Sequence, residues 1–238
     1  MSSSDLSDIK KRAAKGFAWS FSTRLGCEVL QFGSGVVLAR MLTPAEFGLV
    51  GMVAAFTGVA MVFRNFGIGS ALVQHAEVDT NLFSSAFWFN VLCGTSLGII
   101  LYFAAPAIAN FYAEPAVLPL CQLGALNFAV GSFSMCYRAM LARRLDYRTL
   151  GLIEAVGRVV FAGVAIFLAW GLWGAFALVW EAIAENAAIF LLTAHFARQP
   201  LKLCFSWLRV RPLIQFGGWG MGSQFAKLAQ ENVTYLLV

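Results

Sequence analysis

The chain is divided into long apolar runs separated by short polar or basic segments. Six of these runs approach or exceed the roughly 20 residues that a helix needs to cross a bilayer. Every backbone polar group must be satisfied inside lipid, and the runs lack the alternation typical of a β-barrel, so each run is expected to be a helix. The expected helices cover 16–39, 47–66, 83–105, 117–139, 150–170 and 173–196, and a seventh begins at 213.

Helix-breaking residues set the expected boundaries. Pro106 is expected to stop the third helix, and Gly67 and Gly69 interrupt the chain after the second. A tight turn at Gly171 and Leu172 joins the fifth and sixth helices into a hairpin. The predicted organisation is a basic N-terminal segment (1–15), a six-helix transmembrane bundle (16–196), a basic linker (197–212) and the start of a second bundle (213–238).

The composition supports this interpretation, because 60% of the residues are hydrophobic and 12% are charged. Soluble domains have about 45–50% apolar and about 25% charged residues. We therefore predict an all-α integral membrane protein. The net charge of +5 does not indicate nucleic-acid binding, since the basic residues lie in short loops and form no stripe. The five cysteines and two histidines lack metal-site or disulfide spacing, so no metal or cofactor is predicted.

Basic residues near the ends of the runs predict the orientation in the membrane. Thirteen fall on one side and only Arg40 falls on the other. Because cytoplasmic loops are enriched in Lys and Arg, the N-terminus is expected to be cytoplasmic. The thirteen are Lys10, Lys11, Arg12, Lys15, Arg64, Arg138, Arg143, Arg144, Arg148, Arg198, Lys202, Arg209 and Arg211.

The first apolar run carries three polar residues on one helical face: Arg24, Glu28 and Gln31 are spaced i, i+4 and i+7. A charge in hydrocarbon costs at least about 2.5 kcal/mol, so these side chains are expected to turn toward partners or a wet cavity. Two interpretations stay open. The face either holds an internal pair of Arg24 and Glu28, or it lines the path of a polar solute.

Charged residues spaced i, i+4 occur in four of the expected helices. Three of the pairs have opposite signs and could neutralise themselves along one helix face, but two carboxylates cannot. One carboxylate of the acidic pair therefore needs a proton or an outside cation. The four pairs are Arg24 with Glu28, Glu154 with Arg158, Glu181 with Glu185, and Lys227 with Glu231.

The hairpin between the fifth and sixth helices predicts which outside cation this is. Reflecting position 158 across the turn at 171–172 gives position 185. Arg158 and Glu185 should therefore lie at similar depth and form a structural ion pair. Glu181 is then the freer acid and a candidate for ion coupling, although a static network is an equally open interpretation. For Lys227 and Glu231 we favour a polar pathway.

Several segments together resemble the polysaccharide-transporter (Wzx-like) flippases of the multidrug/oligosaccharidyl-lipid/polysaccharide exporter superfamily. The resemblance implies two pseudo-symmetric helical bundles around a cavity that opens alternately to each side. It also implies that this chain is the first bundle with the start of the second. The segments are LARMLTPAEFGLV (38–50), FGIGSALVQ (66–74), SAFWFN (85–90), APAIANFYAEP (105–115), RRLDYR (143–148) and QFGG (215–218).

The resemblance implies a function as well. The family moves polyprenyl-pyrophosphate-linked oligosaccharide from the cytoplasmic to the outer leaflet of the bacterial inner membrane, next to polysaccharide polymerase machinery. Cations and amides would meet the substrate, and carboxylates would carry protons or Na⁺. One departure concerns the chain after Glu231, where Asn-Val-Thr stands in place of an Asn-Asp pair. The implied substrate-binding residues are Arg24, Gln31 and Lys227, and the implied ion-coupling residues are Glu28, Glu181 and Glu231.

Two other functions are alternatives for a multi-pass membrane protein of this kind. A membrane enzyme acting on lipid-linked sugars would predict a large extracytoplasmic loop or a catalytic histidine, and the expected outer loops are short. A cation-coupled exporter of small molecules would need an anionic cavity, against which Arg24 and Lys227 argue. A transporter without enzymatic activity is the preferred interpretation.

Overall fold

The computed structural model describes residues 3–64, 67–75, 77–171 and 173–215, and within them the chain is helical with no β-strand. Residues 207–215 are also helical, so the helix expected from 213 begins six residues earlier. The named helices are α1 (Ser3–Met41), α2 (Pro44–Arg64), α3 (Ile68–Gln74), α4 (Thr80–Tyr112), α5 (Val117–Arg143), α6 (Tyr147–Trp170) and α7 (Ala175–Ala197).

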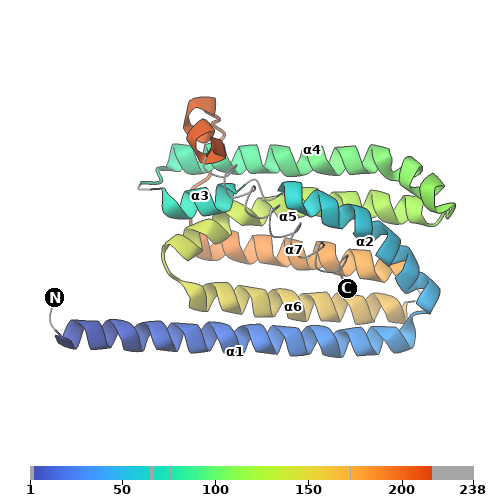
Figure 1. Cartoon of the computed structure of the whole chain (residues 1–238), viewed down its shortest axis with the longest axis horizontal. Helices are drawn as coiled ribbons and strands as arrows, with labels where there is room; N and C mark the ends of the chain where they lie inside the picture. The colour runs from blue at the N-terminus through green and yellow to red at the C-terminus, as the bar shows by residue number, and fades with distance from the viewer. Residues whose placement is uncertain (1–2, 65–66, 76, 172, 216–238) are drawn as a thin grey trace, which may run out of the picture.

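The long helices form a row whose order differs from their order in the sequence. Figure 1 shows α4, α5, α7, α6 and α1 side by side, and successive members of this row are in contact. Helix α2 lies against α5 on one face of the row, and the short α3 packs beside it at one end of the bundle. The centre of the molecule is therefore α5 and α7.

Small residues bring α4 and α5 together. A Cβ added to Gly98 would lie 2.7 Å from the backbone oxygen of Ala125, and one added to Gly94 would lie 2.5 Å from Cβ of Ser132. Without such glycines the two backbones could not approach this closely. The buried amide of Asn90 reinforces the contact, because its Nδ2 donates to the backbone oxygen of Ser132 at 2.6 Å.

Five of the helices, α2, α4, α5, α6 and α7, are long and apolar enough to cross a membrane. The protein is therefore an all-α, multi-pass integral membrane protein. Among the described residues α1 does not reach the same hydropathy, because Arg24, Glu28 and Gln31 interrupt its apolar run. The crossing of the membrane by α1 stays a prediction.

The boundary expected at Pro106 was wrong. Helix α4 runs through Pro106 to Tyr112 and is capped by Ala113, which adopts the left-handed conformation (φ 53°). A proline removes one backbone donor, and a long, well-packed membrane helix tolerates that loss. The second helix ends before Gly67 as expected, but an extra helix follows it. Gly67 has a φ of 68° and is the N-cap of this helix, α3.

The basic residues near the helix ends gather at one end of the bundle. The α5–α6 turn, the end of α7 and the start of α4 lie at the same end, and the α1–α2, α4–α5 and α6–α7 turns lie at the other (Figure 1). This distribution follows the charge asymmetry in the sequence, and the orientation in the membrane stays a prediction. The basic residues at the first end are Arg143, Arg144, Arg148, Arg198, Lys202, Arg209 and Arg211.

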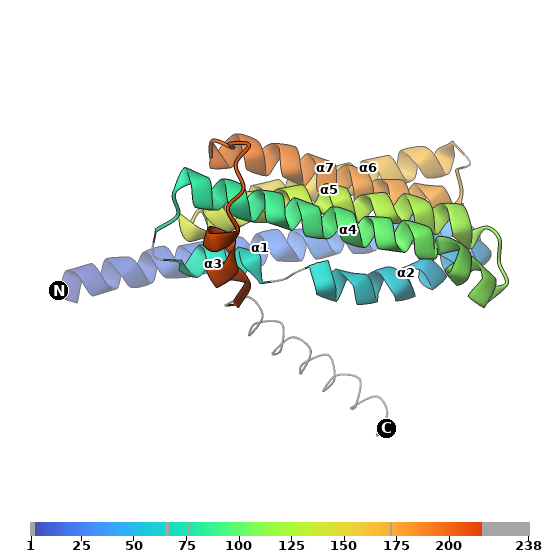
Figure 2. The same cartoon turned by 90° about the horizontal axis from the view of Figure 1, so that it is seen from above.

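The segment after α7 folds back over the start of α4. The N–H of Lys202 donates to Oγ of Ser84 at 3.0 Å, and the N–H of Ser206 donates to Oγ of Ser85 at 3.1 Å. The ion pair of Arg209 with Asp79 completes the attachment at 2.5 Å. Figure 2 shows this segment crossing α4 toward the side of the bundle where α3 lies.

Candidate functional site

Charged side chains from three helices gather in the middle of the row. The structure brings together Arg158 of α6 and Glu185 of α7, with Nη1 3.3 Å from Oε1. These two residues lie at the same depth because the tight turn after α6 makes α6 and α7 antiparallel neighbours. The Arg158 guanidinium also lies over the Phe161 ring, 5.6 Å from its centroid.

Glu154 does not pair with Arg158 along α6, as the sequence spacing had suggested it could. It pairs instead with Arg138 of α5, while Arg158 pairs with α7. Neighbouring helices place an opposite charge closer to each side chain than the turn above it on the same helix. From the sequence, Arg138 counted only as a basic residue near the end of its apolar run, but α5 continues as a helix to Arg143 and brings Arg138 against α6.

Glu181 lies one turn before Glu185 on α7 and is buried, with 5% of its surface exposed. Its Oε2 accepts no hydrogen bond from the described part of the chain. The acidic pair on α7 is therefore asymmetric. Glu185 has a cationic partner, and Glu181 has a buried oxygen without one.

The polar residues of α1 lie beside this cluster and not within it. Arg24, Glu28 and Gln31 are all exposed, and Arg24 and Glu28 do not pair with each other. The internal pair is thus not formed, and the inward orientation expected of these side chains is not seen in the described residues. Cys27, next to Glu28, lies within electrostatic reach of the α6 and α7 charges.

A polar cavity of about 430 Å³ opens beside the cluster, between α3, α5, α6 and α7. The ion pair of Arg138 and Glu154 forms part of its lining, together with Ser134 and Asn186. The amide of Asn186 links α7 to α5, because its Nδ2 donates to Oδ1 of Asn127 at 2.9 Å. This lining offers donors, acceptors and both signs of charge, which suits a hydroxyl-rich or ionic group.

Asn186, which lines the cavity, and its partner Asn127 were not predicted from the sequence. Asn127 and Asn186 are neutral residues inside apolar runs, and an amide within a membrane span was the available signal. Lys227 and Glu231 lie outside the described residues. Within the described residues, no group of three or more His, Cys, Asp or Glu side chains could hold a metal ion.

Comparisons with known proteins show which proteins this chain is similar to. It is 24% identical to the teichuronic acid biosynthesis protein TuaB of Bacillus subtilis over 233 residues, covering 97% of this chain and 48% of the relative. It is 23% identical to the lipopolysaccharide biosynthesis protein WzxC of Escherichia coli, covering 97% and 47% of the two chains. For the succinoglycan biosynthesis transport protein ExoT of Rhizobium meliloti the identity is 26%, with coverage of 91% and 44%.

The chain spans about half the length of the curated relatives that it matches. No solved structure matches it. A sequence model of one family, described as "Polysaccharide biosynthesis protein", covers residues 37–238. Because this match extends over most of a multi-pass helical chain whose relatives carry polysaccharide names, the chain belongs to the polysaccharide biosynthesis protein family.

Proposed function

We propose that the whole protein is a flippase that moves polyprenyl-pyrophosphate-linked oligosaccharide from the cytoplasmic to the outer leaflet of the bacterial inner membrane. The observation that carries the proposal is the charged cluster of α5, α6 and α7 with its polar cavity, inside helices long enough to cross a membrane. Polar groups are costly at this depth and generally mark a path for a polar solute. The transport name of one relative supports the same role.

The substrate would meet the polar face of α1 first. Arg24 and Gln31 are exposed and share a helix face, so they are free to contact a diphosphate and sugar hydroxyls. Lys227 is proposed to complete this contact from the second half of the protein. Alternating access would then carry the polar head group past the charged cluster while the lipid tail stays in the bilayer.

Glu181 is the residue best suited to couple transport to an ion. Its buried Oε2 has no hydrogen-bond donor among the described residues, so a bound proton or Na⁺ would satisfy an oxygen that they leave unpaired. Glu28 and Glu231 are proposed to share this role. Glu185 is excluded from it because Arg158 already neutralises it, and this pair is proposed to hold α6 against α7.

A transporter without enzymatic activity fits the residues better than an enzyme does. The described turns at the end that carries Arg40 are short, and the relatives are named for biosynthesis and transport. We further propose that the N-terminus is cytoplasmic. The polysaccharide polymerase is proposed to receive the transported unit at the outer face.

Complementation of a flippase-deficient strain tests the proposal. The full-length parent protein should restore surface polysaccharide in a strain whose sugar pathway matches its own. Arg24→Ala, Lys227→Ala and Glu181→Gln should abolish this at normal membrane abundance, while Lys202→Ala, at an exposed loop position, should not.

Two other outcomes would change this interpretation. If the variants fail only because they are degraded, these residues stabilise the fold and do not line the path. If the wild-type protein restores no polymer with any sugar pathway tested, the flippase proposal is wrong.

A further inference from the structure

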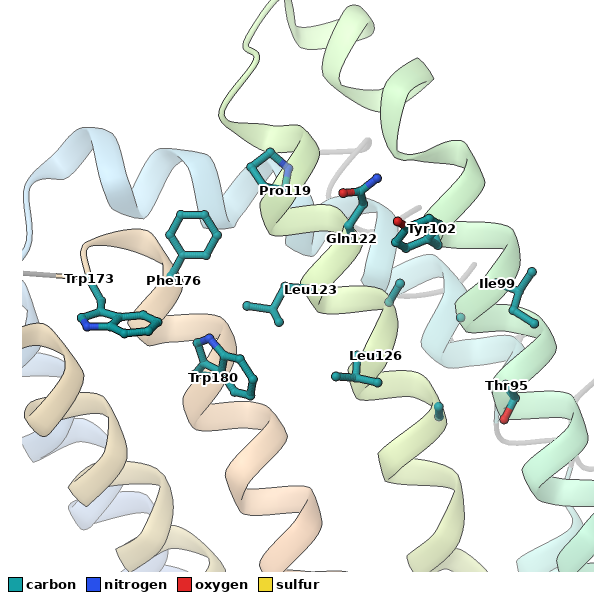
Figure 3. Close-up of a pocket in the computed structure, with 13 residues that line it drawn as sticks. Thr95, Ile99, Tyr102, Pro119, Gln122, Leu123, Leu126, Trp173, Phe176 and Trp180 are labelled. Carbon is teal, nitrogen blue, oxygen red and sulfur yellow. The ribbon is translucent and has the colours of Figure 1, made fainter.

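A second hollow lies on another face of the bundle, as a groove of about 710 Å³ over α5 between α4 and α7 (Figure 3). Its lining is mostly apolar and rich in aromatic rings, unlike the polar cavity. Several of these side chains are large and exposed, including Tyr102 at 48% and Trp173 at 52%. Exposed apolar surface of this kind marks a surface for a partner or a lipid.

The groove faces away from α2. Gly124 of α5 faces α2, because a Cβ added there would lie 3.6 Å from Cγ1 of Val53. The groove residues Gln122 and Leu126 are each two positions from Gly124, which places them on the opposite side of α5. Helix α2 therefore covers one face of α5, and the groove lies on the other.

The described chain also leaves the bundle on the side away from the groove. After crossing α4, the segment 207–215 reaches the α3 side (Figure 2), where Leu213 is buried against the cluster that contains Ile68 and Phe83. Among the described residues, neither α2 nor α3 nor the segment after α7 therefore lines or covers the groove.

The length of the groove matches one leaflet. Its α5 wall runs from Pro119 to Ala129, and ten residues of helix span about 15 Å. The hydrocarbon core of a bilayer is about 30 Å thick, so the groove covers about half of it. Figure 3 shows that Pro119 and Gln122 lie toward one end of the groove, that Trp173 is about level with Leu123, and that Leu126 lies further along α5.

The groove is also polar at the end where a lipid would carry its ester groups. The Gln122 amide lies near the start of α5, and Trp173 lies in the turn between α6 and α7. The Tyr102 hydroxyl lies beside Gln122 (Figure 3). Such groups suit the membrane interface, where aromatic side chains with a polar atom concentrate. The deeper lining is apolar at Leu126 and Ala129, and the hydroxyl of Thr95 lies at the same end.

We propose that this groove binds one acyl chain of a phospholipid from the leaflet next to the α4–α5 and α6–α7 turns. The chain would lie along α5 between Ile99 of α4 and Trp180 of α7, with its ester group near Gln122. Hydrocarbon in this position fills a hollow whose lining otherwise lacks contacts on one side. The proposal concerns a lipid site and does not depend on the transport function.

Photo-crosslinking in nanodiscs tests it. The full-length protein is placed in phosphatidylethanolamine and phosphatidylglycerol doped with a phospholipid that carries a diazirine on its acyl chain. Peptides containing 119–129 and 173–180 should take up at least threefold more label than a peptide containing Phe167, which is 75% exposed and lies on α6 outside the groove.

Filling the groove should remove this excess. Ala129→Phe at the inner end and Leu126→Trp at an exposed position are expected to lower labelling of the groove peptides to the background level. The matched control Ala107→Phe, exposed on α4 outside the groove, should leave it unchanged.

Three results would overturn the proposal. Equal labelling of all exposed apolar helices would show ordinary bulk lipid. Unlabelled groove peptides would show that another part of the protein covers this face. Stronger labelling by a diazirine polyprenyl phosphate than by the phospholipid would assign the groove to the isoprenoid chain. Transport is not the readout, so the first two results leave the flippase proposal unchanged. The third would replace the phospholipid by the carrier lipid of the proposed transport substrate, and would therefore support the flippase proposal.

Discussion

Helices α1 and α7 carry charged residues at the same spacing, but the two pairs differ in their exposure and in the partners that they meet. On α1, Arg24 and Glu28 have opposite signs, yet both are exposed and they do not pair. On α7, Glu181 and Glu185 have the same sign, yet Glu181 is buried and Glu185 meets Arg158 of α6. Spacing puts two side chains on one helix face, but the neighbouring helices decide whether that face is buried and what it meets.

The largest expected effect is on stability at α6 and α7. Arg158→Ala leaves the carboxylate of Glu185 without its partner. Arg24→Ala removes an exposed charge that does not pair with Glu28. We expect Arg158→Ala to destabilise the full-length protein by about 1–3 kcal/mol and Arg24→Ala by much less. Thermal unfolding of both variants in detergent measures the difference.

A charge reversal provides the control for this prediction. The double variant Arg158→Glu with Glu185→Arg keeps one charge of each sign between α6 and α7, so it should recover part of the lost stability. If each single reversal costs as little as the double one, the two residues are not energetically coupled and the comparison between the helices fails.

Replacing Glu185 and replacing Glu181 by glutamine should have different effects on the melting temperature. Glu185→Gln weakens the interaction with Arg158 and is expected to lower the melting temperature by a few degrees. Glu181→Gln keeps the volume of a buried side chain that has an unpaired oxygen, and it should leave the melting temperature unchanged or raised. The same thermal assay compares them, and equal losses would show that Glu181 has a partner the described residues do not contain.

The smallest effect is expected at the exposed ion pair of Asp79 and Arg209. The N–H of Leu82 and the Arg209 guanidinium both stabilise the carboxylate and lower the pKa of Asp79 below its ordinary 3.8. A lowered pKa means that this contribution is complete above pH 3.8 and is lost as the pH falls through the lower folded value.

Asp79→Asn should therefore loosen the segment 201–215 from α4 at neutral pH without unfolding the bundle. Hydrogen exchange of that segment should become faster, but only by a modest factor, because the N–H groups of Lys202 and Ser206 still donate to Ser84 and Ser85. Asp146→Asn is the matched control, since Asp146 caps α6 in the same way and lies away from this segment. Faster exchange in both variants would mean that a general loss of stability is being measured.

The hydrophobic pattern was enough to predict the long helices, although not α3, and one contact between them. Apolar runs of sufficient length become membrane helices because lipid leaves the backbone no other way to satisfy its polar groups. The turn at 171–172 is so short that it fixes the register of α6 against α7, and this is why Arg158 and Glu185 could be matched from their positions alone.

The tertiary structure decided what depends on helices that are distant in the sequence. Glu154 meets Arg138 because α5 lies near α6, which no local spacing indicates. Helix α4 continues past Pro106 because it packs closely against α5. The exposure of Arg24, the polar cavity and the groove over α5 likewise follow from the order of the row, α4, α5, α7, α6 and α1. That order is set by side-chain packing between helices, and the hydrophobic period of a single helix carries no information about it.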